Sequence, residues 1–315
     1  MNWSELDTWI VVTGALLGMA CVLPGTFLML NRQSMLGDGI SHAVLPGLAA
    51  AFLLTGSRDV LPMMTGAVAA GLLTAWLTQA VERFGEVESG AALGVVFCGL
   101  FALGLILIRV SSDKVDLDAD CVLYGAIETA VIDTRSVPRI TWISGGLLLF
   151  NLLLATVFYK ELRISAFDPA LADALGFRAD RIRLGLTLSA SVTTVLAFES
   201  VGSILVIAML VVPAAAASLL TRKLHLLLGL AMLLAAASAL GGHLGAIAAP
   251  RWIGKWVGHP ELGATSSAAM MAVCAGMIFL ACWAISHALT RRHSQPASTG
   301  EATRGKVSVR QECAP

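Results

Sequence analysis

This sequence contains little charge for its size. Only 13% of its 315 residues are Asp, Glu, Lys or Arg, whereas 57% are apolar and the mean hydropathy is +0.80. A soluble domain of this length cannot bury so much apolar surface, so the composition predicts a membrane protein with many spans. The formal net charge of 0 gives no electrostatic basis for binding nucleic acid.

Several motifs are also missing. The six cysteines form no Cys-x-x-Cys pair and fall mostly in apolar runs, which is typical of small buried hydrophobes rather than of a disulfide or zinc framework. There is no Gly-x-x-x-x-Gly-Lys-[Ser/Thr] loop, so ATP-driven activity would require a separate ATPase subunit. No catalytic arrangement of side chains is evident, and we expect no enzyme. No basic residue precedes the first apolar run, so we expect a retained span rather than a cleaved signal peptide.

Long apolar runs dominate what is present. They cover residues 9–30, 36–55, 61–81, 90–109, 139–159, 184–199, 201–220, 224–248 and 263–289. The two runs around Glu199 are either two spans or one span and a re-entrant piece, so eight or nine spans are expected. The fold class is therefore all-α and transmembrane over residues 1–290, and the polar tail 291–315 is predicted to be disordered.

The distribution of Lys and Arg indicates the orientation. With nine spans and an outside N-terminus, 14 basic residues fall in inside segments and 7 in outside segments. Because positive charge concentrates on the cytoplasmic side, we expect the N-terminus outside and the C-terminus in the cytoplasm.

Asp38 and His42 stand four residues apart in the second apolar run, within the stretch MLGDGISHAVLPG at 35–47. On a helix these positions share one face, about 9 Å and about 15 Å below the interface if Arg32 marks it. Ionisable side chains at that depth are costly unless they pair, face water or bind something. A carboxylate oxygen and an imidazole nitrogen on one face form half of a site for a first-row metal. A carboxylate stabilised by the helix dipole and a hydrogen-bonded core histidine are the structural alternatives.

The same run carries a second stripe of small residues, Gly39, Ala43 and Gly47. It lies about 100° around the helix from the face of Asp38, His42 and Pro46. Small residues at this spacing let helices approach closely in lipid. We expect one face of this span to pack on a neighbouring helix and the other to face something polar.

The loop at about 160–183 contains a short helix candidate. Asp168 suits its N-cap, Pro169 its first position and Gly176 its end. A short capped helix in a cytoplasmic loop of a transporter is a suitable docking element for a soluble partner.

Other polar groups within or beside the spans have less specific signals. Glu199 is either a second metal ligand or an interfacial carboxylate, and the latter is favoured. His243 is expected at the interface near the outer surface. The acidic segment 113–120 is interpreted as a solvated loop, and Pro213 as a helix break.

Three stretches carry a resemblance to a known family. LGDGISHAVLPG at 36–47, FDPALADALGF at 167–177 and FESVGSILVIAMLVVPAAAASLLT at 198–221 resemble, in order and spacing, the permease subunits of the manganese/zinc/iron family of bacterial ABC importers. The resemblance runs from about residue 10 to 290. It implies an all-α permease that forms a dimeric pathway, as a homo- or heterodimer in the bacterial inner membrane.

The resemblance also implies partners and roles. Two cytoplasmic ATP-binding subunits and an extracytoplasmic metal-binding protein would work with the permease. Asp38 and His42 of each protomer would bind the transported Mn²⁺, Zn²⁺ or Fe²⁺, and no cofactor would be bound permanently. The resemblance assigns ATPase coupling to a set of loop residues: Phe167, Asp168, Pro169, Ala170, Leu171, Leu175 and Gly176. Because a metal needs a neutral imidazole and an ionised carboxylate, uptake should weaken in mild acid.

Two other functions remain open on the residues alone. In a proton-coupled secondary transporter, Asp38 and His42 would relay protons. In a non-transporting scaffold, altering Asp38 would have no effect. ATP dependence distinguishes the importer from the secondary transporter.

Overall fold

The computed structural model describes residues 3–56, 60–111, 127–132, 137–257 and 265–293. The described part is helical and contains no strand. Its helices are α1 (Glu5–Leu30), α2 (Leu36–Ala43), α3 (Leu45–Thr55), α4 (Val60–Gly85), α5 (Ser89–Ser111), α7 (Ile127–Ala130), α8 (Arg139–Val157), α9 (Tyr159–Phe167), α10 (Pro169–Ala174), α11 (Ala179–Val201), α12 (Ser203–Leu220), α13 (Leu224–Val257) and α14 (Ser267–His293).

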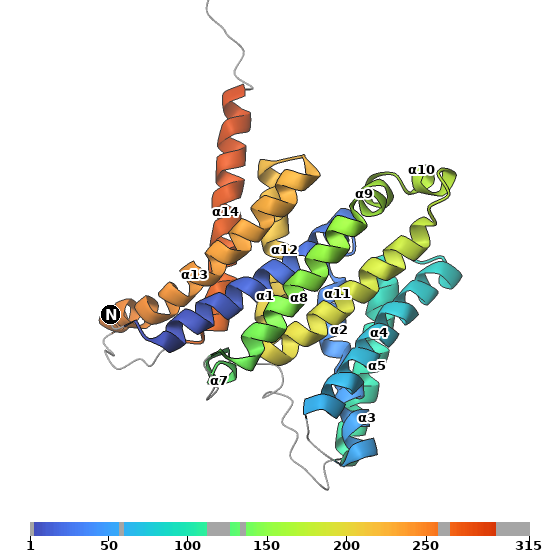
Figure 1. Ribbon diagram of the computed structural model, residues 1–315, viewed down its shortest axis with the longest axis horizontal. Helices are drawn as coiled ribbons and strands as arrows, with labels where there is room; N and C mark the ends of the chain where they lie inside the picture. The colour runs from blue at the N-terminus through green and yellow to red at the C-terminus, as the bar shows by residue number, and fades with distance from the viewer. Residues whose placement is uncertain (1–2, 57–59, 112–126, 133–136, 258–264, 294–315) are drawn as a thin grey trace, which may run out of the picture.

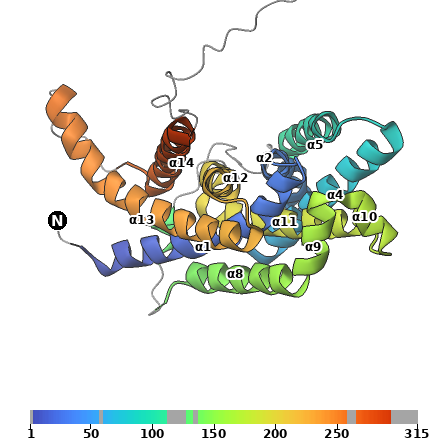
Figure 2. The ribbon, with the colours of Figure 1, turned by 90° about the horizontal axis from the view of Figure 1, so that it is seen from above.

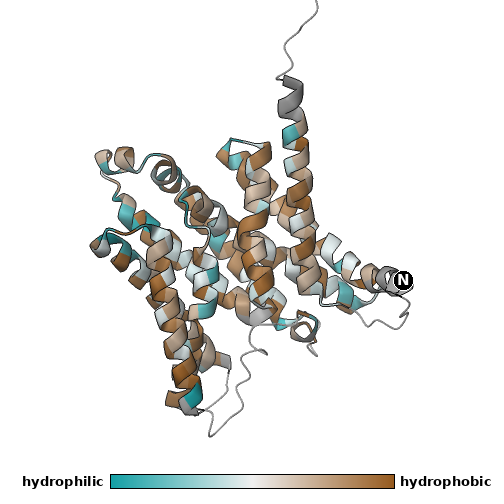
Figure 3. Cartoon of the chain, turned by 180° about the vertical axis from the view of Figure 1, so that it is seen from behind, coloured by the Kyte–Doolittle hydropathy of each residue, from teal (hydrophilic) through white to brown (hydrophobic). Residues whose placement is uncertain are grey.

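Eight helical segments in the described residues are long and apolar enough to cross a membrane, and α2 and α3 together form one of them. This confirms the all-α transmembrane prediction. α11 is a further helix of similar length, 23 residues, so the run before Glu199 is a long helix rather than a re-entrant piece. Figure 3 shows apolar residues along most of the helices, with polar residues mainly near their ends.

The helices form two groups that α11 joins. α1 packs against α8, α11, α12 and α13, and α14 packs against α12 and α13. On the other side, α2, α3, α4 and α5 pack together, with α11 against α4 and α2 (Figure 1). α2 contacts helices of both groups because it also packs on α12.

Small residues permit these close contacts. A Cβ atom on Gly25 of α1 would overlap the backbone carbonyl of Leu210 in α12. Likewise, a Cβ on Gly47 of α3 would overlap the carbonyl of Gly66 in α4. Helix association in lipid depends on such packing, because lipid offers no hydrophobic driving force between helices.

A buried polar contact accompanies a proline in α1. Pro24 has no N–H to donate to the carbonyl of Ala20, four residues earlier. Asn151 of α8, only 2% exposed, donates from Nδ2 to that carbonyl at 3.1 Å. The same amide nitrogen donates to Thr193 Oγ1 of α11 at 2.9 Å. Asn151 therefore satisfies the backbone group that Pro24 leaves unpaired and links three helices.

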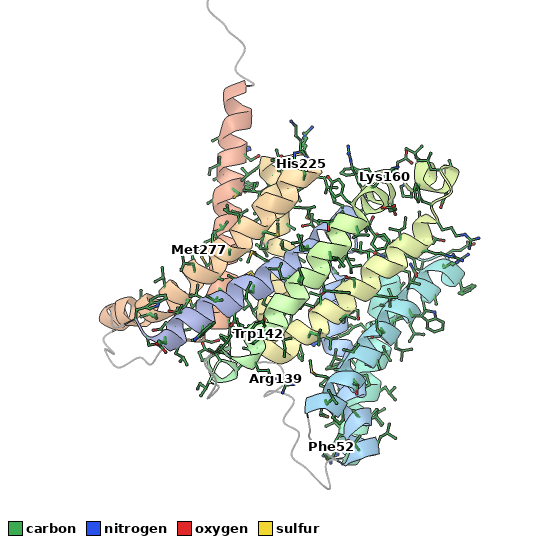
Figure 4. The ribbon with its side chains drawn as sticks, in the orientation of Figure 1. Phe52, Arg139, Trp142, Lys160, His225 and Met277 are labelled. Atoms are coloured by element: carbon green, nitrogen blue, oxygen red, sulfur yellow. The ribbon has the colours of Figure 1, made fainter. Side chains whose placement is uncertain are left out.

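The two ends of the helix bundle differ. Lys160 and His225 lie at one end, and Arg139, Trp142 and Phe52 lie toward the other (Figure 4). The segment of α9 and α10 lies at the first end, and the start of α1 lies away from it (Figure 1). The tail after α14 and the acidic segment 113–120 are outside the described residues.

Candidate functional site

The second span is interrupted where the sequence places Asp38 and His42. α2 ends at Ala43 and α3 begins at Leu45, with Pro46 in its first turn. Because Pro46 lacks an N–H, the carbonyl of His42 loses the donor that a continuous helix would supply. Asp38 therefore lies in the first turn of a short helix and His42 in its last turn. The helix dipole favours negative charge at the first position and positive charge at the second.

The two side chains lie on the same face, as their spacing predicts. His42 Nε2 is 3.6 Å from Asp38 Oδ1. The side chain of Asp38 is 49% exposed and that of His42 is 29% exposed in the single protomer. The helix dipole favours each residue at its own position, but it does not by itself explain why the imidazole nitrogen lies this close to the carboxylate.

The rest of α2 is closely packed. A Cβ on Gly37 would lie 2.8 Å from Leu210 Cδ2, and one on Gly39 would lie 2.7 Å from Leu93 Cδ1. Ile40 is fully buried and Ser41 is 1% exposed. The prediction that the Gly39, Ala43 and Gly47 stripe packs on neighbouring helices is confirmed. The edge with Asp38 and His42 stays open.

Two aromatic residues of α5 contact the histidine. The ring centroid of Phe97 lies 5.6 Å from that of His42, and the centroid of Phe101 lies 6.1 Å away. The two phenylalanines lie 5.9 Å from each other. Sequence reasoning missed them, although their spacing of four residues within an apolar run places them on one helix face. They restrict the orientation of the imidazole beside Asp38.

The described part of one protomer does not contain a full set of metal ligands. Within the described part of the chain, no group of three or more His, Cys, Asp or Glu side chains could hold a metal ion. The carboxylate of Asp38 and the imidazole of His42 offer two ligand types that a first-row metal accepts, and both side chains are partly exposed.

The predicted loop helix is present as α10. Asp168 is its N-cap and accepts a hydrogen bond at Oδ1 from the Leu171 N–H at 3.0 Å. Pro169 occupies the first position, and Gly176 follows the helix with φ of +85°. Phe167, Leu171 and Leu175 are exposed by 61%, 48% and 56%. Ala170, between the cap and Leu171, is also exposed. The fold thus presents apolar side chains on a rigid turn at one end of the bundle.

Two other predicted polar positions have different outcomes. The backbone of Glu199 lies in the last part of α11, and its side chain is outside the described residues. His243 is only 3% exposed, so its side chain is covered by protein, and its expected position near the outer membrane interface stays a prediction. Its Nε2 lies 3.2 Å from Asp7 Oδ1 and its Nδ1 lies 3.1 Å from Ser267 Oγ. The histidine is buried because it joins the starts of α1 and α14 to α13.

Pro213 does not break its helix. It lies inside α12, which continues without interruption from Ser203 to Leu220. The break occurs earlier, between α11 and α12 at Gly202, whose φ of +86° is accessible to glycine. The expectation of a helix break at Pro213 is therefore wrong.

Comparison with known proteins identifies the family. The model of the ABC 3 transport family matches residues 4–257. The chain belongs to the ABC 3 transport family. This confirms the resemblance to the metal-ion permeases that the three sequence motifs indicate.

Several known proteins align with most of this chain. The chain is 43% identical over 282 residues to the manganese transport system membrane protein MntD of Bacillus subtilis, and the alignment covers 88% of this chain and 92% of that protein. It is 40% identical over 209 residues to the zinc transport system membrane protein TroD of Treponema pallidum, covering 65% and 57%. Among solved structures, PsaBC from Streptococcus pneumoniae, in complex with a Fab, superposes with a TM-score of 0.69. That match has 28% identity and covers 92% of this chain and 96% of the other.

Proposed function

We propose that this ABC 3 chain is the membrane permease subunit of an ATP-driven importer of divalent transition metal ions. The observation that carries the proposal is the Asp38–His42 pair, 3.6 Å apart at the open edge of an interrupted span. Two such pairs, one from each of two protomers, supply two carboxylates and two imidazoles. This set of oxygen and nitrogen ligands suits Mn²⁺, Zn²⁺ or Fe²⁺.

The similarity to proteins named as manganese and zinc transport system membrane proteins supports this choice of substrates. The partners follow from the family. Cytoplasmic ATPase subunits would bind α10 through the apolar side chains of Leu171 and Leu175. An extracytoplasmic metal-binding protein would deliver the ion at the opposite end of the bundle. The second protomer is either another copy of this chain or a related permease.

The orientation in the inner membrane is part of the proposal. The α9–α10 segment lies at the end of the bundle where Lys160 and His225 also lie (Figure 4). The basic residues of this segment favour the cytoplasm. With α11 as a ninth crossing helix, the N-terminus would lie outside and the C-terminus inside.

The experiment is a measurement of cellular metal content by elemental mass spectrometry. A transport-deficient host would express the permease with its neighbouring ATPase and binding protein. Wild type should raise the content of one divalent metal, whereas Asp38→Asn and His42→Ala should abolish the rise at matched membrane expression. Glu5→Gln and His225→Ala are matched controls, because both residues are ionisable and exposed and lie at the starts of α1 and α13 rather than on α2 or α5.

A test of ATP dependence distinguishes the importer from a proton-coupled secondary transporter. Depleting ATP while the proton gradient is held should stop the accumulation. Accumulation that continues under these conditions, or that is equal in both site variants, would contradict the proposal.

A further inference from the structure

A cavity of about 280 Å³ lies between α1, α8, α9 and α11. Most of its lining is apolar and includes Leu23, Phe27, Leu154, Phe158 and Leu186. Pockets for small molecules begin at about this size. The space suits one flexible chain of methylene groups rather than a large rigid ligand.

The uncharged polar side chains in the cavity wall, Asn151 and Ser189, are already hydrogen-bonded. Asn151 donates to the Ala20 carbonyl and to Thr193, and its Oδ1 accepts from Ser189 Oγ at 3.2 Å. A polar ligand would find few free partners inside, and its burial without hydrogen bonds would be unfavourable. The interior therefore selects an apolar occupant.

The cavity lies on a face that suits lipid. α8 lies on one side of the bundle, and α2, α5 and α14 lie on the opposite side (Figure 2). The α8 surface beside the cavity exposes apolar side chains: Leu149 by 66%, Leu153 by 59% and Val157 by 62%. The Asp38–His42 edge is thus separate from the cavity, which leaves the cavity accessible to the bilayer when that edge faces a second protomer.

One cation borders this apolar space. Arg181, in the first turn of α11, lines the cavity and is exposed. Within the described part of the chain, no carboxylate forms an ion pair with Arg181. Its neighbour Arg183 differs, since it pairs with Glu82 Oε1 at 3.0 Å. A guanidinium beside an apolar cavity at the end of a span complements an anionic headgroup attached to an acyl chain.

We propose that this cavity is a binding site for an anionic phospholipid. One acyl chain lies between α1, α8 and α11, and the phosphate group pairs with Arg181. The lipid would support the start of α9, which leads directly to α10. The inference does not depend on metal transport, because it uses neither Asp38 nor His42.

Substitutions at two positions, Arg181 and Gly185, separate the parts of the proposal. Arg181→Gln removes the charge, and Arg181→Lys keeps it. Gly185 lines the cavity, and a Cβ placed on it meets no atom within 4 Å, so Gly185→Leu fills the space without a clash. Arg222→Gln and Gly229→Leu are matched controls, since both positions are exposed and Gly229 also has open space around its Cβ.

The experiment is native mass spectrometry of the permease co-purified with its ATPase and titrated with phosphatidylglycerol or phosphatidylcholine. Wild type should retain one phosphatidylglycerol per protomer at lower lipid concentration than phosphatidylcholine. Arg181→Gln should raise the phosphatidylglycerol concentration for half occupancy about fivefold without changing that for phosphatidylcholine. Gly185→Leu should abolish retention of both lipids, while Arg181→Lys and the controls should bind like wild type.

Equal phosphatidylglycerol binding by wild type and Arg181→Gln would overturn the proposal, as would lipid retention by Gly185→Leu. If Gly185→Leu released the ATPase and left lipid binding unchanged, the cavity would belong to the ATPase instead. Asp38→Asn should lose metal uptake but retain the lipid, so failure of the transport proposal is distinguishable from failure of this one.

Discussion

Asn151 shows how one buried amide can compensate for a proline in a membrane span. The carbonyl of Ala20 lacks its usual helical donor because Pro24 has no N–H, and Asn151 Nδ2 supplies the donor at 3.1 Å. Without Asn151, the Ala20 carbonyl would have no hydrogen-bond donor, because the bilayer core contains no water to replace it. We therefore expect this polar side chain to stabilise the fold.

A double-mutant cycle tests this compensation. Asn151→Leu should destabilise the protein by about 1–2 kcal/mol, because it leaves the Ala20 carbonyl unpaired and removes the link to Thr193. Pro24→Ala restores the helical N–H, so it should reduce the cost of Asn151→Leu by about 0.5–1 kcal/mol. Reversible unfolding in mixed micelles measures both quantities. Strictly additive effects of the two substitutions would contradict the compensation.

We expect Phe97 to position His42 in the proposed metal site. Its ring lies 5.6 Å from the imidazole, and such aromatic contacts are worth about 0.5–1.5 kcal/mol. Phe97→Ala should therefore raise the metal concentration for half-maximal uptake roughly two- to tenfold while transport continues. Uptake titrations measure this shift. Phe150→Ala is the control, because Phe150 is an aromatic residue of a different helix, α8, and is 44% exposed. An equal shift in both variants would show that Phe97 has no special role.

The sequence predicted that Asp38 and His42 lie close together, but it did not predict what surrounds them. Spacing alone places Asp38 and His42 on one face, because i and i+4 coincide on a helix. The contact with Phe97 requires the packing of α5 on α2, which no local pattern encodes. The burial of His243 also depends on contacts between helices, so it was not predicted either. Its partner Asp7 lies 236 residues away in the chain, and hydropathy indicates depth but not which helices surround a residue.

At the scale of elements, α10 is the clearest agreement between sequence and structure. Asp168, Pro169 and Gly176 each occupy the capping position that their chemistry favours. Local signals suffice here, because a short helix is defined by its ends. The expectation of a helix break at Pro213 was wrong because the local signal there did not decide the structure. A proline removes one hydrogen bond, but close packing of α12 on α1 and α14 keeps the helix continuous.

The exposed face of α10 provides a test of coupling. Leu171→Ser with Leu175→Ser should reduce the ATPase recovered with the permease at least about tenfold, because removing apolar contacts at the centre of an interface is costly. Detergent pull-downs from matched membranes measure the recovery. Leu226→Ser is the control, since Leu226 is 51% exposed near His225, at the same end of the bundle. Full recovery of the ATPase with the double variant would rule out α10 as its docking element.

At the scale of the whole molecule, composition was sufficient to predict a polytopic helical fold. Low charge and long apolar runs leave few alternatives in a bilayer, because only helices or closed barrels satisfy the backbone there. The interruption of the second span and the crossing of α2 between the two helix groups were not predicted. They depend on contacts such as that of Gly37 with Leu210, which join segments far apart in the sequence.

In the proposed permease, two protomers share one metal site made of Asp38 and His42. The number of Mn²⁺ ions bound by the purified permease dimer tests this site, measured by equilibrium dialysis with electron paramagnetic resonance of the free ion. We expect one ion per two protomers, and none in Asp38→Asn or His42→Ala. One ion per protomer, or unchanged binding in either variant, would contradict it.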